Sequence, residues 1–433
     1  MKKQVLIFIF SSLLLFTFNC DYRSQGQQNT GSIINTAHLD SLYEDIYVDN
    51  KIFGIIHIYS EYPDYKWVGD TDEGIACIDD AARAAVLYLN YFESYTDASS
   101  ILKAKKLLEF IIYMQADNGF FYNFIFYDYS INKDHKNSIN EPNWWSWRAM
   151  WALSNGYLHF VNVDKDFADI IYKSLERITE ELKKIINAEK EIKIINGKDI
   201  ITWLPQKSAS DQASIIILSL LNYYKFSKDE TIPEYIDNLC NGILSVQRGN
   251  STNFPYSAFM SWENLWHAYG NLQSYSLLKA SSLLEREDIL VAAISEINYF
   301  YKFLMNENYL SSFYIDQKND RYIPRETKQY SQIAYNFRVI VYACIEAYNI
   351  TKDSSYAIIA GEIASWFFAN NLAEAQMYFP SSGICYDGIN SQNAINKNSG
   401  AESTIEALLT LLAIEQNSIS KKVLNKYLVQ NTN

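Results

Sequence analysis

Apolar residues recur at helical spacing along almost the whole chain after Gly74. The first such segment has apolar side chains three and four residues apart, which form one continuous stripe at Ile75, Ile78, Ala82, Ala85, Leu89 and Phe92. This spacing predicts an amphipathic helix of about five turns. A second predicted helix runs from about Ser99 to Gln115, and the turn sequence Asp117-Asn118-Gly119 ends the pair. The pattern therefore predicts a helical hairpin.

The same hairpin recurs to the C-terminus. Ten further helices are predicted, several behind Ser, Thr or Asp residues placed as N-caps, with starts near Glu141, Asp164, Ser208, Pro233, Ser261, Glu285, Thr327, Ser354, Ser399 and Ser418. Polar or aromatic residues early in alternate helices are 64, 67, 56, 68 and 67 positions apart, at Asp80, Trp144, Asp211, His267, Tyr335 and Glu402. The chain therefore repeats a unit of roughly 65 residues, one hairpin each, six times.

Hairpins that bury their apolar faces against neighbours must either cap the ends of the array or close into a ring. The odd-numbered helices begin with aromatics, amides and carboxylates, whereas the even-numbered ones have the pattern of solvated amphipathic helices. This asymmetry predicts an all-α (α/α)6 toroid over residues 50–430, with short β-strands in the aromatic-rich connecting loops. An open solenoid is the alternative, although its repeats are usually shorter, at about 34 to 47 residues.

Two local signatures add to the repeat, Cys77-Ile78-Asp79-Asp80-Ala81-Ala82-Arg83-Ala84 and Asn398-Ser399-Gly400-Ala401-Glu402-Ser403-Thr404. With the number, period and polar residues of the repeats, they resemble the six-hairpin glycosidase superfamily. The resemblance implies an enzyme that acts on glycans, with inversion at the anomeric carbon more often than retention. Fold alone does not fix function, so the chemistry has to come from the site.

The N-terminus has the pattern of a processing signal, with Lys2 and Lys3 followed by an apolar run from Val5 to Phe18. The run ends at Cys20, which resembles the lipobox of bacterial lipoproteins, although Thr17-Phe18-Asn19 departs from its usual pattern. We predict a signal peptide at 1–19, a lipid on Cys20, and a tether and N-terminal arm at 20–49. The protein would then be exported and anchored to a membrane, on the periplasmic face or cell surface. Ordinary secretion and an uncleaved anchor are the alternatives.

The amino-acid composition limits the classes of molecule that the protein is expected to bind. The chain has 37 Lys and Arg against 50 Asp and Glu, a formal charge of −13, so its surface repels polyanions and nucleic acid is not expected as a partner. The 34 Tyr, 23 Phe and 9 Trp supply flat rings that can stack on sugars, so an oligosaccharide or polysaccharide is expected. Metal-binding, P-loop, dinucleotide and esterase motifs are absent from the sequence, and neither a metal nor a cofactor is expected. A monomer is expected.

The inner helices of such a toroid run parallel, so their first turns meet at one mouth. Ring closure makes the first and last hairpins neighbours, which predicts that Asp79 or Asp80 lies beside Glu402. Glycoside hydrolysis needs two carboxyl groups that flank the scissile bond. We therefore predict these three residues as catalytic, with acid and base unassigned. The structural alternative is an acidic first turn in which Asp79 pairs with Arg83, four residues on.

Other polar and aromatic residues early in the odd helices are predicted to bind substrate. Tryptophans can stack on a pyranose face, and positive helix N-termini suit bound anions or a developing oxyanion. Packing of the same aromatics between hairpins is the alternative. The predicted binding residues are Arg83, Glu141, Trp144, Trp145, Asp211, Gln212, Asn264, Trp266, His267, Tyr335 and Arg338.

The sequence thus predicts an exported inverting glycoside hydrolase that uses a carboxyl pair in the central funnel. Two other functions remain open on the same scaffold. A non-catalytic glycan-binding lipoprotein would hold a saccharide on the tryptophans, and a polysaccharide lyase or sugar epimerase would use His267, Tyr335 and Arg338. Two carboxyl groups in one funnel would favour the hydrolase, and an aromatic floor without such a pair would favour the binding protein.

Overall fold

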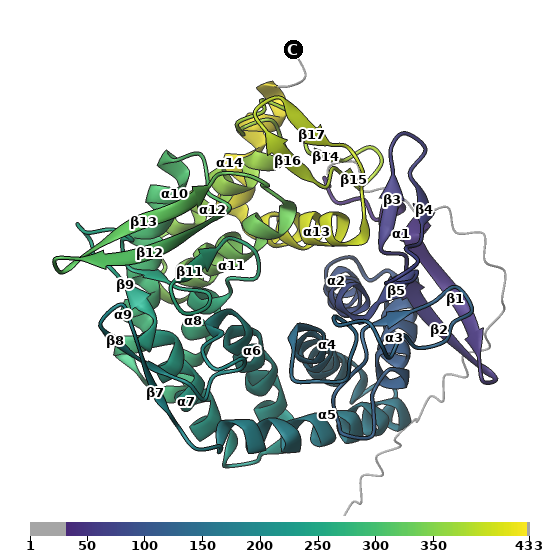
Figure 1. Cartoon of the computed structure of the whole chain (residues 1–433). Coiled ribbons are helices and arrows are strands. Elements are labelled where there is room, and N and C mark those ends of the chain that lie inside the picture. The colour runs from purple at the N-terminus through teal and green to yellow at the C-terminus, as the bar shows by residue number, and fades with distance from the viewer. Residues whose placement is uncertain (1–31, 431–433) are drawn as a thin grey trace, which may run out of the picture. The chain divides into compact units, whose positions relative to one another are not determined.

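A computed structural model describes residues 32–430, and from Ile33 onward it consists of helical hairpins arranged in a ring (Figure 1). Each inner helix contacts the next, and the last contacts the first, so the ring is closed. The predicted (α/α)6 toroid is confirmed. The inner helices are α2 (Ile78–Tyr95), α4 (Trp144–Phe160), α6 (Ser210–Ser227), α8 (Gln273–Leu284), α11 (Ala334–Thr351) and α13 (Ala401–Gln416).

An outer helix packs against each inner helix that precedes it in the chain, so the inner helices all run in one direction. The outer helices are α3 (Ala98–Tyr113), α5 (Lys165–Ile186), α7 (Ile232–Ser245), α9 (Glu287–Glu296), α12 (Ser354–Ala364) and α14 (Ser418–Gln430). A π-helical turn, η1 (Ile297–Tyr301), extends α9 into α10 (Lys302–Asn306), and a 3₁₀ turn, η2 (Ser365–Phe367), follows α12.

The two layers differ in sequence for physical reasons. Outer helix α5 buries one stripe at helical spacing, and its other face is charged and exposed. Inner helix α2 is buried along most of its length because it packs between α3, α4 and α13. Its small residues leave room for this close packing, at Ala81, Ala82, Ala84 and Ala85.

Short antiparallel strands fill the connections, as predicted. A helix, α1 (Ala37–Leu42), and a hairpin, β1 (Tyr43–Val48) with β2 (Lys51–Ile56), precede the ring. The other pairs are β3 (Tyr59–Glu61) with β4 (Lys66–Val68), β5 (Ala76–Cys77) with β6 (Phe124–Ile125), β7 (Ile192–Ile195) with β8 (Lys198–Ile201), β9 (Gln247–Arg248) with β10 (Ala258–Phe259), β14 (Tyr378–Phe379) with β15 (Ile384–Cys385), and β16 (Gly388–Ser391) with β17 (Ala394–Asn396). Strands β11 (Leu265–His267), β12 (Ser312–Lys318) and β13 (Arg321–Lys328) form one sheet.

Three predicted helix starts are wrong, and strand pairing is the reason in each case. The segment after Gly74 enters β5, which pairs with β6, so the helix begins only at Ile78. Thr327 lies in β13, and the ninth predicted helix begins at Ala334. The segment after Ser261 forms β11, whose backbone pairs with β12, so the helix predicted there begins at Gln273.

Cys20 and the predicted signal peptide lie outside the described residues. Within the part of the chain that the structure describes, no helix is both long and apolar enough to cross a membrane. The other four cysteines, Cys77, Cys240, Cys344 and Cys385, are buried free thiols.

One buried carboxyl group in the fold gives a pH test of the structure. Glu296 is fully enclosed, and burial raises its pKa to about 7, even though Phe259 N–H and Ser274 Oγ–H donate to it at 2.8 and 2.6 Å. A carboxyl group whose pKa is raised by folding favours the folded state below its unfolded pKa, and this advantage is lost as the pH rises through the folded pKa.

We expect Glu296→Gln to change the pH dependence of stability. Between pH 4 and pH 8 the free energy of unfolding of the wild type should fall by about 3 kcal/mol relative to that of the variant, because the shift spans roughly 2.5 pH units. Urea unfolding of both proteins at a series of pH values measures the difference. A difference that does not change with pH would show that Glu296 is not buried as described.

Candidate active site

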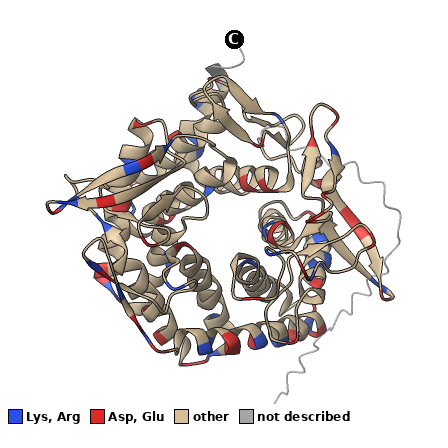
Figure 2. Cartoon of the chain, in the orientation of Figure 1, with Lys and Arg blue, Asp and Glu red and all other residues tan. Residues whose placement is uncertain are grey.

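A cavity of about 310 Å³ opens at the N-terminal ends of α2, α11 and α13, where the ring closes. Its charged and polar lining comes from the first two turns of these helices, from strand β3 and from two loops, at Tyr59, Glu73, Asp79, Asp80, Arg83, Tyr335, Asp387, Glu402 and Ser403. Figure 2 shows acidic and basic positions together on α2 and acidic positions on the neighbouring α13. The structure therefore brings all three predicted catalytic residues to one cavity.

Arg83 lines the cavity and forms several ion pairs there. Its side chain is 4% exposed and contacts three carboxylates, from Asp80 at 3.0 Å, Glu402 at 2.7 Å and Glu406 at 3.4 Å. Because Asp80 and Glu402 bind different nitrogens of one guanidinium, their bound oxygens are at most about 8 Å apart. The closure of the ring thus produces a close carboxyl pair from residues more than 300 positions apart in the sequence.

The two carboxyl groups of this pair have unequal surroundings. Asp80 is 3% exposed at its side chain, and burial raises its pKa to about 6 against the opposing effect of Arg83. Cys77 Sγ–H donates to its second oxygen at 3.2 Å. The Glu402 side chain is 44% exposed. One member of the pair can therefore hold a proton near neutral pH, and the other is open to water.

The Asp79 carboxylate pairs with a different arginine from the one that the sequence spacing suggests. Arg148 donates to its carboxylate at 2.6 Å, and Asn123 Nδ2 donates to its other oxygen at 3.3 Å. The Asp79–Arg83 side-chain pair does not form, because Arg83 Nε donates to the backbone carbonyl of Asp79 instead. Arg148 also donates to Tyr335 Oη at 3.3 Å and lies 4.8 Å from the Trp144 ring centroid. Asp79 is thus tied to the next inner helix.

A second group of polar residues, from α6 and β11, lies at the same end of the ring. His267 Nε2 is 3.0 Å from the Asp211 carboxylate, and Nδ1 is 2.9 Å from the carbonyl of Tyr269. The Tyr269 ring stacks on the imidazole at 3.9 Å, and its pKa is raised by burial and by the charges of Asp211 and Glu402. Both ring nitrogens of His267 are therefore engaged, and the carbonyl requires a hydrogen on Nδ1.

Two tryptophans predicted to bind substrate have packing roles instead. Trp145 is 4% exposed and donates to two backbone carbonyls. Trp266 is 3% exposed and stacks on Phe313. Neither ring lines the cavity, because hydrogen bonding and aromatic packing hold both inside the fold.

Four polar residues predicted to bind substrate instead form hydrogen bonds or ion pairs within the protein. Gln212 accepts from Trp147, and Asn264 donates to the carbonyl of Ile315. Arg338 pairs with Glu406, and Glu141 accepts from Asn143 just before α4. None of these four side chains lines the cavity.

Sequence reasoning missed three residues of the site. Asp387 lines the cavity, accepts from Gly400 N–H and Ser403 Oγ–H, and has a pKa raised by burial. Arg148 forms an ion pair with Asp79. Glu406, whose side chain has no exposed surface, contacts Arg83. Glu406 is one helical turn after Glu402, and this spacing on an inner helix was an available signal. No comparable pattern marks Asp387, which lies in a loop.

Within residues 32–430, no group of three or more His, Cys, Asp or Glu side chains is placed to hold a metal ion.

No known family model matches the chain, and no curated protein matches it in sequence. Solved structures do match its fold. A sugar epimerase from a ruminal bacterium has a TM-score of 0.62 at 12% identity, with 90% of this chain and 97% of that chain covered. A family 76 glycoside hydrolase from a bovine Bacteroides thetaiotaomicron strain has a TM-score of 0.56 at 13% identity, with 90% and 79% covered.

A third similar structure contains a saccharide. It is an inactive variant of an α-1,6-mannanase of Salegentibacter sp., in which two consecutive aspartates are replaced by asparagine, in complex with α-1,6-mannotriose. Its TM-score is 0.51 at 11% identity, and 87% of this chain and 95% of that chain are covered. At these identities the likeness establishes the (α/α)6 toroid fold alone.

Proposed function

We propose that this protein is a glycoside hydrolase whose active site is the cavity at the N-terminal ends of the inner helices. The observation that carries the proposal is the pair of carboxyl groups on Arg83, one buried with a raised pKa and one exposed. Hydrolysis of a glycosidic bond needs one carboxyl group that donates a proton and one that activates water or attacks the sugar.

In this proposal Asp80 is the general acid and Glu402 is the general base. A pKa of about 6 leaves Asp80 partly protonated near neutral pH, where it can donate to the leaving oxygen. Arg83 contacts Glu402 directly at 2.7 Å, and the 44% exposure of the Glu402 side chain lets a water molecule reach it and give up a proton. Asp79 is a positioning residue, because Arg148 and Asn123 hold its carboxylate.

The separation of the pair is compatible with inversion. Inverting enzymes hold the two carboxyl groups about 6.5 to 9.5 Å apart to admit a water molecule, and retaining enzymes about 5 to 5.5 Å. The limit of about 8 Å that Arg83 sets allows both arrangements, and the resemblance to the six-hairpin glycosidases favours inversion. Water would then attack the anomeric carbon from the face opposite the leaving group, lose its proton to Glu402, and leave the product with inverted configuration.

The similar structures support a saccharide as the substrate. Two are glycoside hydrolases, and one of these holds a mannotriose and was inactivated at two consecutive aspartates. This chain also carries two consecutive aspartates, Asp79 and Asp80, in the first turn of an inner helix that lines the cavity.

A sugar epimerase is the second candidate, favoured by the epimerase among the similar structures and by the position of His267 near the mouth. Epimerisation needs a base that removes a proton from carbon and an acid that returns one on the other face. His267 does not line the 310 Å³ cavity, whereas Asp80 and Glu402 both do. The carboxyl pair therefore supports hydrolysis better.

The test is a screen of diverse oligosaccharides for released reducing ends, with proton NMR of the same mixtures. Hydrolysis predicts new reducing ends from at least one substrate, with the anomer inverted at early times. Conversion of a sugar into its epimer without any new reducing end would reject hydrolysis and establish the second candidate.

The role of Asp80 predicts the pH dependence of activity. Turnover should fall as the pH rises above about 6, because the acid form of Asp80 is lost. Asp80→Asn should remove this basic limb and lower turnover at its optimum at least about 10²-fold. Asp387→Asn serves as the control, since Asp387 lines the same cavity and also has a raised pKa. Loss of the limb in Asp387→Asn instead would assign the acid to Asp387.

We further propose that the protein is exported and carries lipid on Cys20, on the basis of the apolar run that ends there. Labelling of producing cells with a fatty-acid analogue should mark the wild type and not Cys20→Ala. Equal labelling of the two would reject the lipid anchor, and an unprocessed N-terminus in the secreted protein would reject cleavage before Cys20.

A further inference from the structure

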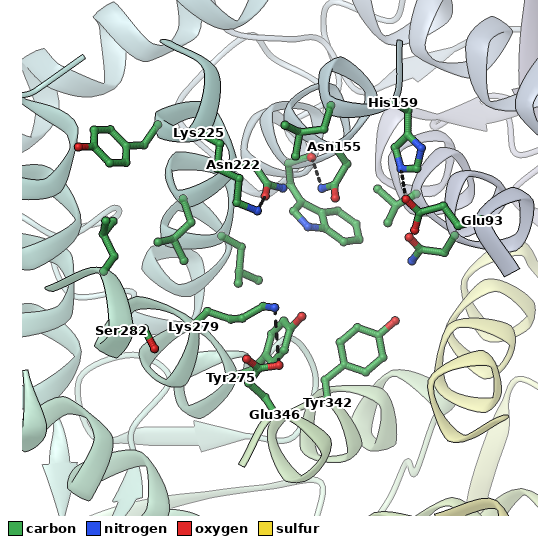
Figure 3. A pocket seen from close by; sticks show the side chains of 18 of the residues that line it. Glu93, Asn155, His159, Asn222, Lys225, Tyr275, Lys279, Ser282, Tyr342 and Glu346 are labelled. Atoms are coloured by element: carbon green, nitrogen blue, oxygen red, sulfur yellow. Dashed lines mark hydrogen bonds and ion pairs between the residues drawn. The ribbon is translucent and has the colours of Figure 1, made fainter. Parts of the chain in front are cut away.

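A second and larger cavity lies at the other end of the ring. It has a volume of about 650 Å³ and is lined by side chains of α2, α4, α6, α8 and α11, most of them from the middle and C-terminal turns (Figure 3). Because the inner helices are parallel, this cavity opens on the face opposite the proposed active site. The buried Arg338, which lines it, contacts Glu406, and Glu406 contacts Arg83 on the other side, so charged side chains separate the two cavities.

The charge of this rear cavity is uneven. Lys225 and Lys279 extend into it from α6 and α8 on the same side (Figure 3). Lys279 has Glu346 at 3.6 Å, whereas Lys225 donates to Asn222 at 3.0 Å and, among the described residues, has no carboxylate within 4 Å. Lys225 is an exposed residue, and its pKa is lowered by partial burial and by the positive charge of Lys279. Two ammonium groups thus face one space, and among the described residues only that of Lys279 has a carboxylate within 4 Å.

The remaining acid of the cavity forms no ion pair with either lysine. Glu93 lies across the cavity from the lysines and contacts His159 at 3.5 Å (Figure 3). An anion between Lys225 and Lys279 would relieve their mutual repulsion and make two charge-assisted hydrogen bonds.

The rest of the wall suits hydroxyl groups and a sugar ring. Asn155 Nδ2 donates to the carbonyl of Trp151, so its side-chain oxygen can accept from a ligand. The side-chain oxygen of Asn222 accepts from Lys225, so its Nδ2 can donate to a ligand. Both side chains point into the cavity, and Tyr275 lies beside Lys279 (Figure 3). Amide pairs bind neighbouring hydroxyl groups, and aromatic faces pack on a pyranose ring.

We propose that the rear cavity is a binding site for a saccharide with one acidic group, of the uronic acid type. The carboxylate lies between Lys225 and Lys279, and the hydroxyl groups bind Asn155 and Asn222. Nothing in this assignment depends on catalysis at the opposite mouth, so the site stands or falls separately from the proposed hydrolase.

The test is calorimetric titration of the full-length protein with galacturonate, glucuronate and mannuronate, each beside its neutral parent sugar. At least one uronate should bind at one site per chain and at least about tenfold more tightly than its parent, the factor expected for a charged partner. Lys225→Met/Lys279→Met should weaken its binding at least about tenfold. Lys352→Met is the matched control, since this exposed lysine ends α11 on the same face but does not line the cavity.

Three results would overturn the proposal. No saturable binding of any uronate would mean that the lysines only offset the negative ends of the helix dipoles. Equal binding of a uronate and its neutral parent would remove the role of the charge. Binding that is lost in Asp79→Asn but kept in Lys225→Met/Lys279→Met would move the ligand to the front cavity. Thermal unfolding of each variant checks that the fold is intact.

Discussion

Glu402→Gln is expected to lower turnover at least about 10²-fold, with the fold unchanged. Glutamine keeps the size of the side chain but cannot take a proton from water, so the proposed base is lost. The Glu402 side chain is 44% exposed, so the loss of its ion pair should change the free energy of unfolding little. Turnover on the substrate found in the oligosaccharide screen and the melting temperature are measured together.

The matched control is Glu73→Gln, because Glu73 lines the same cavity and hydrogen bonds to Tyr59. This variant should keep activity within a few-fold of the wild type. Near-normal turnover in Glu402→Gln would remove Glu402 from the chemistry and leave its contact with Arg83 as a structural ion pair.

The largest expected loss of stability follows the removal of Glu406. Its side chain has no exposed surface and contacts both Arg83 and Arg338, whose side chains are 4% and 3% exposed. Glu406→Ala leaves two buried guanidinium groups without this shared carboxylate, which should cost about 3–5 kcal/mol in the free energy of unfolding. Denaturant unfolding of the wild type and the variant measures the loss.

A double variant separates the buried charge from the packing. In Glu406→Leu/Arg338→Met the acid and one base are removed together, and Arg83 keeps Asp80 and Glu402 as partners. We expect this variant to be more stable than Glu406→Ala, because apolar replacement of a buried pair avoids an uncompensated charge. A double variant as unstable as Glu406→Ala would show that cavity formation, and not charge, dominates the loss.

The ring and its seam could be predicted from the sequence because they depend on regular features. Helical periodicity locates the hairpins, six repeats of similar length can close, and closure makes the first and last hairpins neighbours. The proximity of Asp80 to Glu402 follows from this topology, whereas their shared contact with Arg83 was not predicted. The glycan chemistry of the seam is still a proposal.

The positions of the other site residues depend on long-range contacts that a single sequence does not reveal. The residues around Trp266 in the sequence are polar and aromatic, which is typical of a helix start at the mouth of the ring. Because β11 pairs with β12, however, the Trp266 side chain lies in the core against Phe313. Asp387 reaches the cavity only because its loop folds back onto the start of α13, where Gly400 N–H donates to it. Both outcomes arise from long-range backbone pairing, which local periodicity does not encode.

The most direct measurement of the central claim is a crystal structure of Glu402→Gln with the saccharide identified by the screen. The proposed mechanism predicts a saccharide in the 310 Å³ cavity, with a glycosidic oxygen within hydrogen-bonding distance of Asp80. It also predicts a water molecule between the anomeric carbon and the side-chain amide that replaces the Glu402 carboxylate. A saccharide bound with its glycosidic oxygen away from Asp80, or bound only outside this cavity, would contradict the mechanism.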